Sequence, residues 1–177
     1  MRDNGYTLME LVVVIGVLIV VIGAGMNVFY QSLRSGAKID YELFLDGTSR
    51  VVENSMSLLI RYGQVVGVEG QDDSVCLSAG SGGVVGNTLV VAENGRQTEY
   101  ALISDFIASS SSSPSQQIMV SPEGMKVNAI EFNWVCGYGK QEKVVVSYRA
   151  QAEKDDQVVP VEESYSFEVL VKNSGYY

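Results

Sequence analysis

A single carboxylate, Glu10, lies at the edge of a long apolar stretch near the start of the chain. From Leu11 to Leu33 no residue carries a charge, and Leu11 to Met26 is almost wholly apolar. As a helix with a rise of about 1.5 Å per residue, Leu11 to Leu33 spans roughly 34 Å, enough to cross the hydrocarbon core of a bilayer. A glutamate beside such a segment costs free energy unless it is neutralised or paired. The first chemical question is therefore which group pairs with Glu10.

The other residue types exclude most enzyme chemistry. The chain has 177 residues and no histidine, which removes the commonest general base and the commonest zinc ligand. Its two cysteines, Cys76 and Cys136, are too few for an all-cysteine zinc site and lack the short spacing of metal ligands. We therefore expect no enzymatic activity, no catalytic residue, no metal site and no cofactor. The net charge of −9 would repel phosphate backbones, so nucleic acid is not an expected partner.

One long predicted helix, from residue 6 to about residue 62, must position Glu10. Its first half is apolar on all sides, as in a membrane span. In the second half an apolar face recurs at intervals of three and four residues, which is typical of a helix that packs one stripe against a soluble domain. The residues of this face are Tyr41, Leu45, Thr48, Val52, Met56 and Leu59. Gly63 is the predicted end of the helix.

After the helix the pattern changes to short runs of Val, Ile, Phe and Tyr between turn residues, which is typical of β-strands. Asn94-Gly95 suits a tight hairpin turn. The segments SAGSGG (78–83) and ASSSSSPS (108–115) are predicted to be exposed loops. The predicted strands lie near residues 74–78, 87–92, 97–103, 117–120, 128–136, 142–151 and 164–172.

These patterns predict an α+β fold in which the long N-terminal helix packs on an antiparallel β-sheet. We expect four parts along the chain. They are a leader (1–5), a transmembrane or assembly half of the helix (6–33), an amphipathic half of the helix (34–63) and a β-rich globular head (64–177).

Three interpretations of the N-terminal segment remain open at this point. A cleaved secretory signal explains the apolar run, but its start has only Arg2 as a basic side chain and its apolar segment is long. A plain membrane anchor explains the run, but not the Gly5-Tyr6 junction or a helix that continues far beyond it. The third interpretation is a segment that needs Glu10.

The third interpretation is supported by a family resemblance. The stretch GYTLMELVVVIG resembles the class III signal of type IV prepilins and type II secretion pseudopilins. In that signal a glycine, an aromatic residue, Thr-Leu, an aliphatic residue and a glutamate precede a long apolar helix. The resemblance is close over residues 5–26, and a helix followed by a β-rich head extends it over the whole chain. Tyr6 replaces the commoner phenylalanine, the leader carries little positive charge, and the frequent mid-helix proline is missing.

The resemblance implies processing and then assembly. A membrane peptidase would cut after Gly5 on the cytoplasmic side, and Tyr6 would become the N-terminus, which is usually N-methylated in this family. Glu10 would pair with the Tyr6 amine of the same or a neighbouring subunit, which offsets the desolvation of two isolated charges. The alternative for Glu10 is simply a favourable position at a helix N-terminus.

The implied partners are other pilin or pseudopilin subunits, a prepilin peptidase and N-methyltransferase, an inner-membrane assembly platform and membrane lipid. The implied location is the cytoplasmic (inner) membrane, crossed once with the head extracytoplasmic, and then the pilus or pseudopilus. The strand succession of the head loosely resembles J-type minor pseudopilins and minor pilins, so we expect a minor structural subunit. A membrane-anchored extracytoplasmic β-domain that binds a ligand and does not polymerise is the alternative.

Two further features of the head have open interpretations. An even pair of cysteines outside the cytoplasm favours a disulfide between Cys76 and Cys136, and the alternative is two small buried residues. Acidic residues cluster within 69–73 and 153–156, where we expect solvated turns rather than calcium sites.

Overall fold

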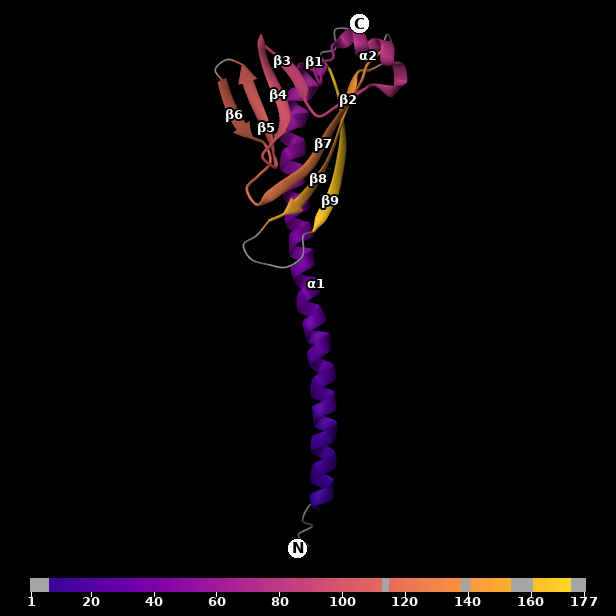
Figure 1. Ribbon diagram of the computed structural model, residues 1–177, viewed down its shortest axis with the longest axis vertical. Coiled ribbons are helices and arrows are strands. Elements are labelled where there is room, and N and C mark those ends of the chain that lie inside the picture. Colours follow the sequence, from indigo (N-terminus) through magenta and orange to yellow (C-terminus); the bar gives the residue numbers. More distant parts are fainter. Residues whose placement is uncertain (1–6, 113–114, 138–140, 154–160, 173–177) are drawn as a thin grey trace. The chain divides into compact units, whose positions relative to one another are not determined.

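The computed structural model describes residues 7–112, 115–137, 141–153 and 161–172. The chain divides into two compact units, Met1–Asp40 and Tyr41–Tyr177. One helix, α1 (Leu8–Tyr62), contributes its first part to the first unit and Tyr41–Tyr62 to the second (Figure 1). The division between the units falls inside the predicted amphipathic half of the helix.

The predicted end of the long helix is confirmed. Helix α1 ends at Tyr62, and the amide of Gly63 donates to the carbonyl oxygen of Leu59 over 2.8 Å. A Cβ at Gly63 would lie 2.7 Å from the same Leu59 oxygen, closer than side chains approach. Glycine is therefore required where the chain leaves the helix and enters the first strand.

A five-stranded antiparallel sheet follows, with the strand order β1-β3-β4-β5-β6. The predicted hairpin at Asn94-Gly95 is confirmed, because these two residues join β3 to β4 with φ values of 51° and 78°. Positive φ at both central residues is the requirement of a type I′ turn. The strands are β1 (Gln64–Val68), β3 (Leu89–Glu93), β4 (Arg96–Ile103), β5 (Phe106–Ser112) and β6 (Ser115–Met119).

A second antiparallel sheet has four strands in the order β2-β7-β8-β9. Burial alternates along β7 and β8, so one face of this sheet is buried and the other faces solvent. The strands are β2 (Val84–Gly86), β7 (Met125–Val135), β8 (Lys143–Ala152) and β9 (Glu162–Leu170).

The second unit has one hydrophobic core, shared by both sheets and the last part of α1. Leu45, Val52, Met56 and Ile60 of α1 are fully buried, so the predicted apolar face does pack against the head. The sheets supply the side chains Val65, Val68, Leu89, Val91, Tyr100, Ile107, Met125, Val127, Ile130, Phe132, Trp134, Val144, Val146, Tyr148, Ala150 and Val169.

The strand predicted at residues 74–78 is wrong, because these residues belong to helix α2 (Asp73–Ala79). Asp72 caps this helix, since its carboxylate accepts from the amides of Ser74 and Val75 over 3.1 and 3.4 Å. The Ser74 hydroxyl also donates to it, which is the largest cause of the lowered pKa of Asp72. Seven residues are too few for periodicity to separate a helix from a strand, and the cap was the missed signal. A short 3₁₀ helix, η1 (Gly80–Gly82), follows.

The loop predicted at residues 108–115 is also wrong over its described part, which lies in β5 and β6. Serine has little preference for strands, but the ladder to β4 fixes this segment, with Ser109 opposite Tyr100 and Ser111 opposite Thr98. Strands β1, β2 and β5 were not predicted, and the single predicted sheet is two sheets.

The packing of α1 predicts opposite outcomes for two neighbouring substitutions. Met56 is fully buried, and Leu58 is 67% exposed. Met56→Ala should lower the free energy of unfolding by about 2–5 kcal/mol because it leaves a cavity. Leu58→Ala should change it by less than about 0.5 kcal/mol. Denaturant unfolding of the full chain in detergent measures both, and equal losses would contradict the assignment of the buried face.

Candidate functional site

The start of α1 places Glu10 beside a backbone donor. Thr7 precedes the helix, and its hydroxyl oxygen accepts from the Glu10 amide over 3.3 Å, while the Thr7 amide donates to Glu10 Oε2 over 3.5 Å. This reciprocal pair is a capping box, which supplies partners to two of the backbone amides that a helix start leaves free. The second bond is long, so the carboxylate is held loosely. Gly5 and Tyr6, the predicted processing and assembly residues, lie outside the described residues.

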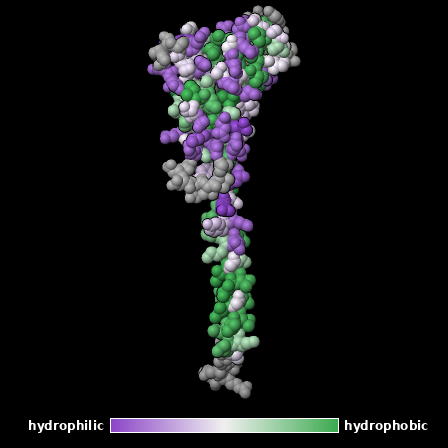
Figure 2. All heavy atoms as spheres, viewed as in Figure 1, coloured by the Kyte–Doolittle hydropathy of each residue, from purple (hydrophilic) through white to green (hydrophobic). Residues whose placement is uncertain are grey.

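In the described part of the first unit, the large apolar side chains are not covered by protein. The large apolar side chains from Leu8 to Leu33 are all exposed, and Figure 2 shows them as an apolar surface on this part of the helix. In the part of the chain that the structure describes, α1 is the one helix whose length and composition would allow it to cross a membrane. An apolar surface of this extent needs lipid or other apolar helices around it.

A second exposed apolar stripe lies on the part of α1 that belongs to the second unit. It consists of Phe44, Val51, Leu58 and Tyr62, which are between 40% and 67% exposed. The first three recur every seven residues, so they lie along one side of the helix, apart from the buried face. The sequence pattern predicted only one apolar face for this half of the helix, and the seven-residue interval was the signal of the second.

The structure joins Cys76 and Cys136 in a disulfide, with their Cα atoms 5.8 Å apart. Cys76 lies in α2 and Cys136 directly follows β7. The bond therefore links the short helix to the end of the longest strand. The two cysteines are 60 residues apart in the sequence. A cross-link over that length raises the free energy of the unfolded chain by about 4 kcal/mol, because it removes conformational entropy from it.

Six residues after Cys136 in the chain is a buried carboxyl group, Glu142, which the sequence pattern did not indicate. Glu142 is 2% exposed, and its Oε1 accepts from Trp134 Nε1 over 2.7 Å. Burial raises the pKa of Glu142, because desolvation disfavours the charged form, and the bond from Trp134 acts in the opposite direction. The sequence KQEK around Glu142 reads as a solvated charged run, so it gave no signal of burial.

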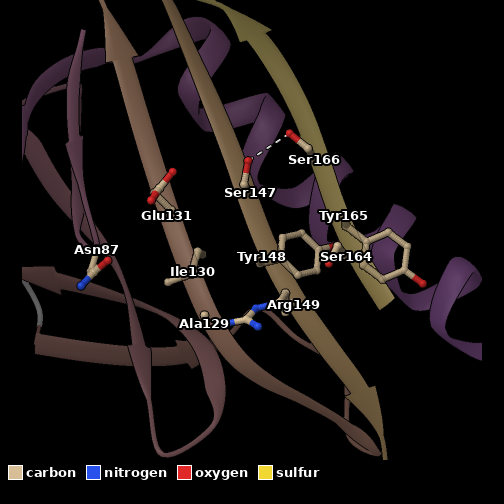
Figure 3. Close-up of a pocket in the computed structure, with 10 residues that line it drawn as sticks. All are labelled: Asn87, Ala129, Ile130, Glu131, Ser147, Tyr148, Arg149, Ser164, Tyr165 and Ser166. Carbon is tan, nitrogen blue, oxygen red and sulfur yellow. Dashed lines mark hydrogen bonds between the residues drawn. The ribbon is translucent and has the colours of Figure 1, made fainter. Parts of the chain in front are cut away.

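A hollow of about 440 Å³ lies on β7, β8 and β9 (Figure 3). Within it the hydroxyl oxygens of Ser147 and Ser166 are 3.0 Å apart and partner each other. Arg149 Nη1 lies 3.9 Å from Glu162 Oε1. The hollow therefore offers hydroxyl groups and a guanidinium group to solvent. Its lining is mixed, because Ile130, Tyr148 and Tyr165 contribute apolar surface beside these polar groups.

Three residues of the acidic clusters have local partners. Glu69 Oε2 accepts from the Asn87 amide over 2.9 Å, Asp72 caps α2, and Glu153 pairs with Lys126 over 2.7 Å. Residues 154–156 of the second cluster lie outside the described residues. Within the described ranges no group of three potential metal ligands occurs.

No protein-family model, no curated protein and no solved structure matches the chain. The assignment of a function therefore rests on the residues and their geometry.

The buried Glu142 predicts a pH-dependent stability. Because the pKa of Glu142 is raised in the folded state, the folded chain keeps a proton at pH values just above the ordinary glutamate pKa, where the unfolded chain has lost it. The free energy of unfolding therefore falls as the pH rises through that range. Glu142→Gln cannot ionise and keeps an oxygen for Trp134. The melting temperature of the variant minus that of the wild type should therefore increase from about pH 4 to pH 7. Glu99→Gln, at an exposed position of β4, is the control and should give a difference that pH changes little. A pH-independent difference for Glu142→Gln would contradict a buried, titrating carboxyl group.

Proposed function

We propose that this chain is a structural subunit of a type IV pilus or of a type II secretion pseudopilus. In this proposal it is processed after Gly5, anchored in the cytoplasmic membrane by α1, and then assembled with other subunits through that helix. The observation that carries the proposal is the apolar surface of α1. Apolar side chains of α1 are exposed in the first unit, and Phe44, Val51, Leu58 and Tyr62 are exposed in the second.

A membrane alone would not cover both surfaces. Leu11 to Leu33 is already enough to fill the hydrocarbon core of a bilayer. The stripe comes later in the chain and alternates with the charged residues Asp46, Arg50 and Glu53, which are expensive to place in lipid. An exposed apolar stripe on a helix outside lipid favours a helix of another subunit as its partner. This supports assembly over a role as an anchor only.

The geometry at Glu10 is compatible with a role in assembly. Glu10 Oε2 is 3.5 Å from the Thr7 amide, and Tyr6 is the residue directly before Thr7. If Tyr6 became the N-terminus, its ammonium group would be the strongest donor near the helix start, because charge-assisted hydrogen bonds exceed neutral ones. In the proposed filament the carboxylate exchanges its long bond to Thr7 for the Tyr6 amine of a neighbouring subunit.

The Cys76–Cys136 disulfide supports an extracytoplasmic head, because disulfides persist in oxidising compartments. The finer assignment to a minor subunit of the J type rests on the succession of strands in the sequence. The prepilin peptidase, the N-methyltransferase and the inner-membrane assembly platform are the partners that this function requires.

One observation favours the alternative of a membrane-anchored binding module. The hollow on β7, β8 and β9 has both apolar and hydrogen-bonding groups in its lining and would suit a ligand that offers both kinds of group (Figure 3). A binding module would need the anchor, but neither Glu10 nor the exposed stripe of α1. Variants of these residues therefore separate the two functions.

Glu10→Ala should still insert into the membrane, because apolar area drives insertion and a carboxylate opposes it. It should also still be cut after Gly5. Its yield in filaments sheared from the cell surface should fall at least tenfold relative to membrane-retained protein. The reason is that removing one side of a buried ion pair costs about 3–5 kcal/mol. Leu58→Gln should reduce filament yield in the same assay without loss of folding.

Two variants serve as controls in this assay. Glu53→Gln introduces the same side chain as Leu58→Gln at an exposed helix position outside the stripe, and it should assemble normally. Gly5→Val should block processing itself and leave a longer chain in the membrane. Normal filament yield for both Glu10→Ala and Leu58→Gln would reject assembly through α1 and favour the binding module.

A further inference from the structure

The two sheets present four edge strands, and three of them have features that discourage pairing with another chain. Strand β2 is only three residues long. Strand β1 carries a bulge between Val65 and Gly67. Strand β9 carries three glutamates, Glu162, Glu163 and Glu168. Short length, bulges and charges are the usual protections of a sheet edge.

The fourth edge, β6, has none of these protections. The segment from Phe106 to Val120, which contains β5 and β6, has no charged residue in a chain of net charge −9. Ile118 and Met119 are 60% and 67% exposed. Since adjacent residues of a strand point to opposite faces, both faces of the sheet are uncovered at β6. An open, uncharged edge of this kind is a template for a further strand.

The backbone groups available at this edge follow from the pairing with β5. The Val120 amide donates to the Ile107 carbonyl oxygen over 2.7 Å. Hydrogen-bonded pairs alternate along an antiparallel ladder. The backbones of Gln116 and Ile118 therefore point toward β5, and those of Ser115, Gln117 and Met119 point to the free edge.

We propose that β6 pairs with β6 of a second copy of this chain, antiparallel and centred on Gln117. In this register Ser115 lies opposite Met119, Gln116 opposite Ile118, and Gln117 opposite Gln117. All three outward-pointing residues then find outward-pointing partners, which gives about six backbone hydrogen bonds. The two Gln117 side chains are directly opposite each other and can bond through their amides.

The charges of the chain allow a second copy at this edge and at few other places. Two copies of an acidic chain repel each other over most of their surfaces, and the uncharged segment from Phe106 to Val120 lets them approach. A pair of five-residue strands is a small interface, so we expect weak dimers that form only at high protein concentration. This interface has two-fold symmetry and closes after two copies. It therefore cannot build a filament and is independent of assembly through α1.

The test uses the full chain with Gln117→Cys, purified in detergent micelles and treated with a short bismaleimide linker. Both native cysteines are in the disulfide, so the added thiol is free to react alone. The matched control is Gln97→Cys, an exposed glutamine of the central strand β4 in the same sheet. Gln117→Cys should give several-fold more linked dimer than Gln97→Cys. Adding Met119→Lys, a charge at the edge, should reduce that dimer several-fold.

A second measurement checks the register and does not depend on Gln117→Cys folding well. Chains with Gln116→Cys mixed with chains with Ile118→Cys should form a direct disulfide under mild oxidation, and neither variant alone should do so to the same extent. Equal linking of Gln117→Cys and Gln97→Cys, or no preference for the mixed pair, would overturn the proposal. Linking of Gln117→Cys only to a different protein in native membranes would also overturn it. The linked dimer should still form when the chain also carries Leu58→Gln. A failure of β6 pairing can therefore be told apart from a failure of assembly through α1.

Discussion

The apolar surface of α1 has to be removed from water along the length of the helix, and the other features depend on how this is done. In the second unit, Leu45, Val52, Met56 and Ile60 are covered by the two sheets, and this contact defines the core. In the first unit, apolar side chains are exposed on all sides, which requires lipid or neighbouring helices. The stripe of Phe44, Val51, Leu58 and Tyr62 is covered neither by the sheets nor by lipid, because it is exposed and comes after the segment that fills the bilayer core.

The same helix explains why a carboxylate is tolerated at the edge of the apolar run. The Thr7–Glu10 capping box gives the carboxylate a local partner before any assembly occurs. A loosely held local bond keeps the carboxylate at the helix start and leaves it able to accept a stronger donor. The two interpretations of Glu10 that the sequence left open, a helix-start residue and a partner for an amine, are therefore successive roles in the proposed function.

Features with a local cause could be predicted from the sequence. The end of α1 at Gly63 and the turn at Asn94-Gly95 follow from the backbone freedom of glycine and asparagine, and the buried face of α1 follows from its periodicity. Features that depend on distant partners could not be predicted. Serines 109–111 become a strand through pairing with β4 and β6, and the buried carboxyl group of Glu142 has its donor in the distant Trp134. Helix α2 had a readable signal in Asp72, which we took as part of an acidic turn.

Within the candidate site, the sequence located Glu10 and the cysteine pair, because an isolated charge and an even number of cysteines are visible without a structure. The exposed stripe on α1 and the open edge of β6 needed the structure, since exposure depends on what the rest of the chain covers. Intact mass and N-terminal sequencing of the membrane-extracted protein test the central claim most directly. The account predicts a mature chain that begins at Tyr6 and carries an N-methyl group. A chain that still begins at Met1, or one that begins after residue 20, would contradict it.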